Sequence, residues 1–166
     1  APQPTSDTAL TIISFKHNFI FIKTTKTAST SIEVDLSQVV EDNAIVTPIQ
    51  PASARHVPRN YSTAFGDFYN HMSAADIRDI LGAERFSGML KFCVERDPLS
   101  KCISHFHMLR NSPLHNNEGR YVLEWDDYCR VGVFPIDTDK YSETVNGEDV
   151  LLVDEVLRYE DLKTQL

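Results

Sequence analysis

Glycine is scarce in this chain: the 166 residues contain six glycines, and none of them lies before Gly66. The phosphate-binding loop of nucleoside-triphosphate hydrolases has the form G-x-x-x-x-G-K-[ST], in which glycines let the backbone approach the phosphates. The first 65 residues cannot match that pattern, although Lys26 is followed there by hydroxyl side chains. The sequence therefore disfavours a nucleoside-triphosphate hydrolase and a small kinase-like phosphotransferase.

Basic residues are also in deficit. Lys and Arg number 16 against 24 Asp and Glu, which gives a formal net charge of -8. A nucleic-acid binder needs a surplus of basic side chains to neutralise phosphates, so no nucleic-acid partner is expected. Residues 115–166 hold five basic and 13 acidic side chains, and this excess accounts for the whole net charge. We therefore expect any anion site in the first two-thirds of the chain and a solvated surface in the rest.

Long apolar runs and paired cysteines are absent as well. The longest apolar runs cover only a few residues, so no membrane span is expected, and no signal peptide is visible. The three cysteines form no C-x-x-C pair, and His105 and His107 do not share a helix face. We expect a reduced, cytoplasmic setting and no metal. The Golgi lumen is the alternative if an upstream anchor was removed, because the chain starts without Met.

Strand and helix patterns alternate through the first hundred residues. Asn18–Ile22 and Met89–Val94 are short and almost continuously apolar, which is typical of buried parallel strands. Ser73 and Asp97 are N-terminal helix signals. The helix after Asp97 is expected to have an apolar face formed by Leu99, Cys102/Ile103, Phe106 and Leu109. Other expected elements are a strand at 11–15 and helices near 30–40 and 125–131. The pattern predicts one α/β domain over residues 1–166, with a central parallel sheet flanked by helices.

A segment rich in hydroxyl side chains lies between a predicted strand and a predicted helix. It consists of Lys26, Thr27, Ala28, Ser29, Thr30 and Ser31. In open parallel sheets, ligands bind beyond the carboxyl ends of the strands, near the N-termini of the following helices. Free N–H groups there attract an anion, and the helix dipole adds about 0.3–1 kcal/mol. The same residues are also compatible with a helix start that binds no ligand.

A second strand–helix junction carries Arg96, with Ser104 eight residues later in the helix. An arginine in such a position can grip a phosphate through two hydrogen bonds. The alternative is an arginine paired with Asp97 or Glu95 and an exposed Ser104. Taken together, the two junctions favour a ligand with phosphate-like groups at both ends.

At these residues the sequence resembles sulfotransferases that use 3′-phosphoadenosine-5′-phosphosulfate (PAPS). The segment 22–31, I-K-T-T-K-T-A-S-T-S, is similar to their 5′-phosphosulfate loop, with Ala28-Ser29 in place of the more usual pair of glycines. V-E-R-D-P at 94–98, with Ser104, resembles their 3′-phosphate motif. F-Y-N-H at 68–71 and R-Y-E-D-L at 158–162 are similar to two further elements. The closest likeness is to the heparan/chondroitin uronyl 2-O-sulfotransferase branch.

The resemblance implies a P-loop-like three-layer fold, and it implies a role for each matching residue. Lys26 and His71 would be catalytic, and the 5′-phosphosulfate would be held by Lys26, Thr27, Ala28, Ser29, Thr30 and Ser31. Arg96 and Ser104 would hold the 3′-phosphate of PAPS, whose product is adenosine 3′,5′-bisphosphate. His71 would take the proton of the acceptor hydroxyl, with His56 and Glu33 as alternative bases.

The acceptor is expected to carry a hydroxyl and to be a neutral or mildly acidic carbohydrate, because few basic side chains are on offer for a heavily sulfated glycan. The alternative function is a module that binds the bisphosphate nucleotide without transfer. The chain ends soon after Leu162, where many relatives continue, so the resemblance leads us to expect that a C-terminal segment of longer relatives is missing.

Overall fold

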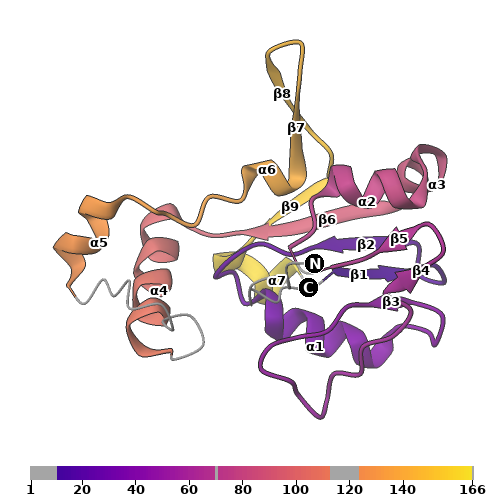
Figure 1. The fold of residues 1–166 in the computed structure, drawn as a ribbon, viewed down its shortest axis with the longest axis horizontal. Helices are drawn as coiled ribbons and strands as arrows, with labels where there is room; N and C mark the ends of the chain where they lie inside the picture. The colour runs from indigo at the N-terminus through magenta and orange to yellow at the C-terminus, as the bar shows by residue number, and fades with distance from the viewer. Residues whose placement is uncertain (1–10, 70, 113–123, 166) are drawn as a thin grey trace, which may run out of the picture.

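The computed structural model describes residues 11–69, 71–112 and 124–165, and these form a mixed α/β fold (Figure 1). Its main sheet has five strands in the order β3-β1-β2-β6-β9. They are β1 (Thr11–Ser14), β2 (Phe19–Ile22), β3 (Ile45–Val46), β6 (Leu90–Glu95) and β9 (Glu155–Arg158). Two hairpins join β4 (Ser62–Thr63) to β5 (Gly66–Asp67) and β7 (Ser142–Val145) to β8 (Glu148–Leu151).

Helices lie on both faces of the main sheet, with α1 on one face and α2 and α3 on the other (Figure 1). By contrast, α4 and α5 extend beyond the end of the sheet. The helices are α1 (Ser29–Val39), α2 (Ala74–Leu81), α3 (Ala83–Ser87), α4 (Pro98–Asn111), α5 (Trp125–Val131), α6 (Thr138–Tyr141) and α7 (Leu162–Gln165). A 3₁₀ turn, η1 (Tyr159–Asp161), connects β9 to α7.

The predicted parallel sheet is confirmed in part: β2, β6 and β9 are parallel, but β1 runs opposite to the rest, so the sheet is mixed. β2 pairs in parallel with β6, and β6 with β9, whereas β1 pairs antiparallel with β2 and β3. The reason is the length of the connection between β1 and β2, which spans Phe15–Asn18. A parallel crossover needs a dozen or more residues, so this connection can form only a hairpin. The apolar run predicted burial of β2 correctly, but it carries no information on whether a neighbouring strand runs parallel or antiparallel to β2.

Strand β2 supplies the hydrophobic core on both faces of the sheet, because successive side chains point to opposite sides. Ile20 and Ile22 pack in the cluster that contains Ile77 of α2. Phe21, between them, packs in the other cluster, together with Leu36 of α1. All three β2 side chains are fully buried, and burial of each stabilises the fold by about 1.5–3 kcal/mol.

The predicted starts of α2 and α4 are confirmed by their caps. Ser73 Oγ accepts the N–H of Asp76 at 3.1 Å, and the Asp97 carboxylate accepts the N–H of Ser100 at 2.8 Å. Each cap satisfies a helix N–H that has no partner within the helix. These local signals were sufficient to place the two helices.

The predicted apolar face of α4 is wrong in part. Leu99 and Ile103 are 61% and 41% exposed, whereas Phe106 is buried as expected. The buried residue near the start of the helix is instead Lys101, which pairs with Glu95. Because α4 leaves the end of the sheet, its first turns have no sheet face to cover, and an ion pair fills the contact.

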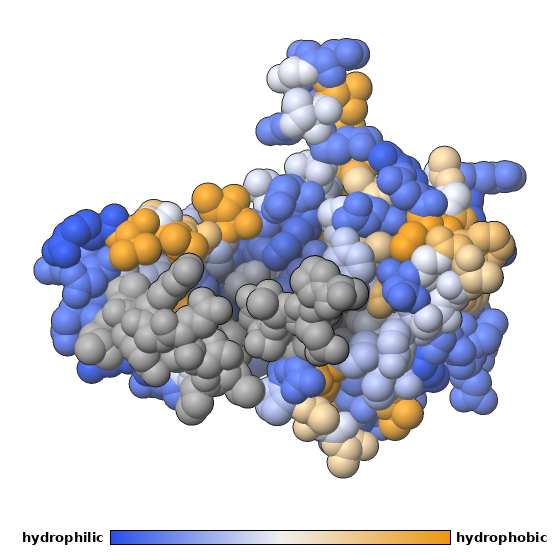
Figure 2. All heavy atoms as spheres, in the orientation of Figure 1, coloured by the Kyte–Doolittle hydropathy of each residue, from blue (hydrophilic) through white to orange (hydrophobic). Residues whose placement is uncertain are grey.

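The region of α4 and α5 has an aromatic cluster of its own. Its rings are Phe106, Trp125, Tyr128 and Phe134, with centroids of contacting rings 5.3 to 5.7 Å apart; Trp125 stacks on Tyr128, and the other contacts are edge-to-face. Apolar side chains are also visible on its surface in Figure 2, and exposed residues of this region include Val131, Val133 and Ile136. Among the described helices, none combines the length and hydrophobicity that a membrane span requires.

Candidate functional site

Three strand ends meet at one edge of the main sheet. Because β2, β6 and β9 are parallel neighbours, the segments that follow them lie side by side (Figure 1). They are the Lys26–Ser31 loop, the Arg96 junction and the segment beginning at Tyr159. Three of the four segments that carry the sulfotransferase resemblance are therefore gathered in one place, although about 130 residues separate the first from the last.

Direct contacts join these three segments. Arg96 Nη1 donates to the carbonyl oxygen of Lys26 at 3.3 Å, and the Arg96 guanidinium lies 4.3 Å from the ring centroid of Tyr159. The carboxylate of Glu160 accepts the N–H of Asp97 at 2.9 Å. The contact between Arg96 and Tyr159 is a cation–π interaction, which fixes the plane of the guanidinium. The Arg96 guanidinium thus contacts the Lys26 carbonyl and the Tyr159 ring. The predicted alternative was a pair with Asp97 or Glu95.

The loop before α1 has an unusual backbone. Lys26 and Ala28 have φ values of 60° and 57°, in the left-handed region that costs a residue with a side chain about 1–2 kcal/mol. Ala28 is also the N-cap of α1, and no side chain caps that helix start. The first N–H groups of α1 are thus left for another acceptor, and left-handed residues in a loop help to turn such groups toward an anion.

Several loop hydroxyls form hydrogen bonds with neighbouring loop residues, whereas the prediction was that they would hold a ligand. Ser29 Oγ donates to the carbonyl oxygen of Thr24 at 2.7 Å, and Thr27 Oγ1 lies 2.8 Å from Thr24 Oγ1. Thr30 Oγ1 accepts a hydrogen bond from Lys23 at 2.9 Å, and the Ser31 side chain is exposed. The hydroxyls of Thr27 and Ser29 therefore hold the shape of the loop, which leaves its backbone as the anion-facing group.

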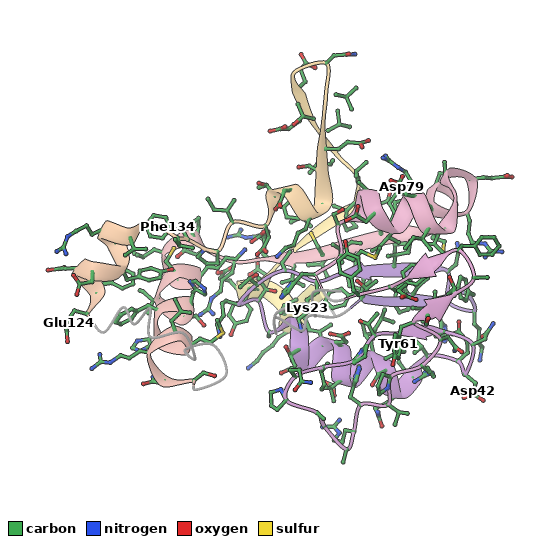
Figure 3. All side chains as sticks on the ribbon, viewed as in Figure 1. Lys23, Asp42, Tyr61, Asp79, Glu124 and Phe134 are labelled. Carbon is green, nitrogen blue, oxygen red and sulfur yellow. The ribbon has the colours of Figure 1, made fainter. Side chains whose placement is uncertain are left out.

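A cavity of about 520 Å³ opens beside the loop. Its described lining includes every residue from Lys23 to Ser31, with His71, His105, Phe134 and Lys140 from other parts of the chain. Three of these lining residues are lysines, and none of the described ones is acidic. Figure 3 shows Lys23 at the end of the sheet where β2 ends and Phe134 on the segment that leads away from α5. The size is typical of a small-molecule site, and the lining favours an anion.

The cations at this edge repel one another. Burial lowers the pKa of Lys26, and the nearby charge of Arg96 lowers it further. Such crowding of like charges is unfavourable in the protein alone and is relieved when an anion binds between them. The arrangement of Lys26 and Arg96 thus favours an anionic ligand over a cationic or neutral one.

His71 is brought to the same cavity, with a φ of 53°. Burial, followed by the charges of Lys140 and Lys23, lowers the pKa of His71 to about 3. The negative charge of Asp137 and a hydrogen bond with the backbone of Lys23 act in the opposite direction. At neutral pH the imidazole is therefore neutral, the form that can accept a proton.

Lys23, which lines the cavity, forms a buried ion pair with Glu33. Lys23 Nζ lies 3.6 Å from Glu33 Oε2, and the side chain of Glu33 is fully buried. Neither carboxylate oxygen has a hydrogen-bond partner among the described residues. Burial raises the pKa of Glu33 to about 8, although the charge of Lys23 opposes the rise. Glu33 lies outside the described lining of the cavity, which weakens its case as the alternative base.

Two further predicted residues lie apart from this cavity. His56 is buried, with Nε2 2.9 Å from the carbonyl oxygen of Thr47, and it is not among the described lining residues. Ser104 is half-buried on the α4 face that also carries Lys101 and Met108. Met108 lines the cavity, but Ser104 lines neither it nor the neighbouring cavity of about 480 Å³ that Arg96 borders. The structure thus unites Lys26 to Ser31 with His71 and leaves Ser104 outside.

The sequence interpretation missed Asp137 and Lys140. Asp137 is buried, and its carboxylate accepts hydrogen bonds from the N–H of Thr25 at 2.8 Å and from the Thr25 hydroxyl at 2.9 Å. Lys140, one turn later in α6, pairs with Asp137 and lines the cavity. Both residues belong to the acidic last third of the chain, which was expected to be solvated surface. The spacing of an Asp and a Lys three residues apart in a helix is too common to have signalled a site.

Comparisons of the chain with family models, with curated proteins and with solved structures gave no significant match.

Replacement of Ala28 by glycine should stabilise the protein by about 0.5–1 kcal/mol. The left-handed backbone at Ala28 costs alanine more than glycine, and this gain exceeds the entropy that glycine adds to the unfolded chain. Ala28 is exposed, so its methyl group contributes little packing. Chemical denaturation would measure the difference. Ser31→Gly is the control: Ser31 is exposed inside α1, so glycine there should destabilise, and a loss at both positions would contradict the argument.

Proposed function

We propose that this protein is a PAPS-dependent sulfotransferase that moves a sulfuryl group to a hydroxyl of a carbohydrate. The proposal includes a P-loop-like arrangement of the sheet and its helices. The observation that carries it is the meeting of the Lys26–Ser31 loop, Arg96 and the Tyr159 segment at adjacent strand ends, beside a lysine-lined cavity that also holds His71.

The residues present fit a nucleotide with two anionic groups. The uncapped N-terminus of α1, Lys26 and Lys140 suit the 5′-phosphosulfate. Arg96 is the candidate for the 3′-phosphate, since it borders the neighbouring cavity, which shares Phe134 and Pro135 with the first. Ser104, the second residue proposed for the 3′-phosphate, lines neither cavity.

Sulfuryl transfer makes one S–O bond and breaks another. The acceptor oxygen attacks sulfur as the bond from sulfur to the 5′-phosphate oxygen breaks, and the electron pair of that bond stays on the phosphate. Lys26 stabilises the charge that develops on this oxygen, and His71 takes the proton of the acceptor hydroxyl. An anion in the cavity offsets the charges of Lys140 and Lys23, which raises the pKa of His71 from about 3 and makes it a stronger base.

The proposed nucleotide can be tested by ligand-induced stabilisation. Adenosine 3′,5′-bisphosphate should raise the melting temperature, by the equivalent of about 2.7 kcal/mol at a hundred times its dissociation constant, and ATP should raise it much less. Equal shifts with both nucleotides, or no shift with either, would contradict the assignment of the cofactor.

Arg96→Ala extends the same test to a single residue. It should weaken binding of the bisphosphate much more than binding of adenosine 5′-phosphate, which lacks the 3′-phosphate. Arg78→Ala is the control, because Arg78 likewise contacts a distant part of the chain, through a two-point ion pair with Glu143, but does not border either cavity. If Arg96→Ala weakens the binding of both nucleotides alike, Arg96 has a structural role only.

A further inference from the structure

We infer that Asp137 is a positioning residue for this cavity, holding Lys140 and Thr25 in the wall that faces the anion. The inference rests on the proposed function, because it assigns a role within the same site. Asp137 itself is not among the described residues that line the cavity, whereas Lys140 and Thr25 both line it.

The contacts of Asp137 join four parts of the chain. Its carboxylate accepts two hydrogen bonds from Thr25 of the loop and pairs with Lys140 of α6. Lys101 Nζ of α4 lies 2.7 Å from Asp137 Oδ2 and 2.8 Å from Glu95 at the end of β6. The Asp137 side chain is 1% exposed. Since all these partners are found in one buried cluster, Asp137 ties the loop to α6 across 112 residues of sequence.

The cluster balances its own charges. Glu95 and Asp137 supply two negative charges, and Lys101 and Lys140 supply two positive ones. Lys101 is buried and paired on both sides, whereas Lys140 is the member that reaches the cavity. A free lysine side chain loses rotamer entropy when a ligand fixes it. Because Asp137 already holds Lys140 before the ligand arrives, this loss of entropy does not reduce the affinity for the ligand.

Positioning and simple electrostatics predict opposite results, which makes the inference testable. The negative charge of Asp137 lies close to the cavity and repels an anion, so its removal would tighten binding if charge alone mattered. If Asp137 positions Lys140 and Thr25, its removal weakens binding in spite of that gain. The direction of the change therefore separates the two roles.

The experiment measures binding of adenosine 3′,5′-bisphosphate by calorimetry. We expect Asp137→Asn and Lys140→Gln each to weaken binding about tenfold. The affinity of the double variant should be no lower than that of the less tightly binding single variant, because both substitutions act through the same ammonium group. Asp154→Asn is the matched control: Asp154 accepts the N–H of Lys91 and pairs with its Nζ at 3.0 Å, but at the opposite end of β6. It should leave affinity unchanged.

A second readout needs no ligand. Amide exchange at Thr25, measured by NMR, should be faster in Asp137→Asn than in the wild type, because the N–H loses its charged acceptor. Bisphosphate binding by Asp137→Asn that equals or exceeds the wild type, or unchanged exchange at Thr25, would overturn the inference and leave the proposed function standing. If Asp137→Asn does not fold, unchanged affinity in Lys140→Gln overturns it. Absence of bisphosphate binding by the wild type would overturn both.

Discussion

Replacement of His71 by alanine should reduce the turnover of sulfuryl transfer by about two orders of magnitude or more and leave nucleotide affinity nearly unchanged. A positioned base contributes about 10²–10⁴-fold, and the neutral imidazole of His71 in the cavity is the candidate for that role. Initial rates with labelled PAPS would give turnover, and calorimetry with the bisphosphate would give affinity.

Lys26→Ala is the comparison for His71→Ala, because Lys26 is expected to act on the leaving group and to touch the nucleotide as well. It should lower both turnover and nucleotide affinity. A His71→Ala protein with full turnover would remove His71 from the role of base. The choice would then return to His56 and Glu33, of which neither is in the described lining of the cavity.

The free energy of unfolding of the wild type, compared with that of Glu33→Gln, should fall between pH 5 and pH 8, by an amount on the order of a few kcal/mol. Burial raises the pKa of Glu33 from 4.5 to about 8, so in this interval the folded protein holds a proton that the unfolded chain has lost. A rise in pH then favours unfolding of the wild type, whereas the glutamine variant has no such proton. Urea denaturation of both proteins at the two pH values would measure the difference.

Glu41→Gln is the control for this pH effect. Burial tends to raise the pKa of Glu41, but hydrogen bonds from Lys16, Ser14 and Phe15 prevail and lower it to about 2. Both the folded and the unfolded protein have lost this proton by pH 5, so the difference from the wild type should stay constant up to pH 8. A constant difference for Glu33→Gln as well would show that Glu33 is ionised in its pair with Lys23.

Features set by neighbouring residues could be predicted from the sequence. The caps at Ser73 and Asp97 require only a side chain and an N–H three residues later, and both were predicted correctly. Burial of β2 followed from its apolar run. The position of the Lys26 loop, between a buried strand and a helix, followed from the order of these local patterns.

Features set by distant contacts could not be predicted in this way. The direction of β1 depends on its hairpin with β2, and the exposure of Leu99 depends on α4 leaving the sheet. Asp137 and Lys140 are placed beside the Lys26 loop by contacts with Thr25 across more than 100 residues, and only Lys140 of the two lines the cavity. The left-handed backbone at Ala28 was not predicted either, because alanine stands there in place of glycine, the usual marker of such a conformation.

The most direct measurement of the central claim is transfer of labelled sulfate from PAPS by the wild-type protein to a panel of hydroxyl acceptors that includes neutral and acidic carbohydrates. We expect labelled product with at least one carbohydrate, and its formation should be strongly reduced in Lys26→Ala. Tight binding of adenosine 3′,5′-bisphosphate without transfer to any acceptor would contradict the enzyme and favour a nucleotide-binding module. Absence of both binding and transfer would contradict the whole account of the site.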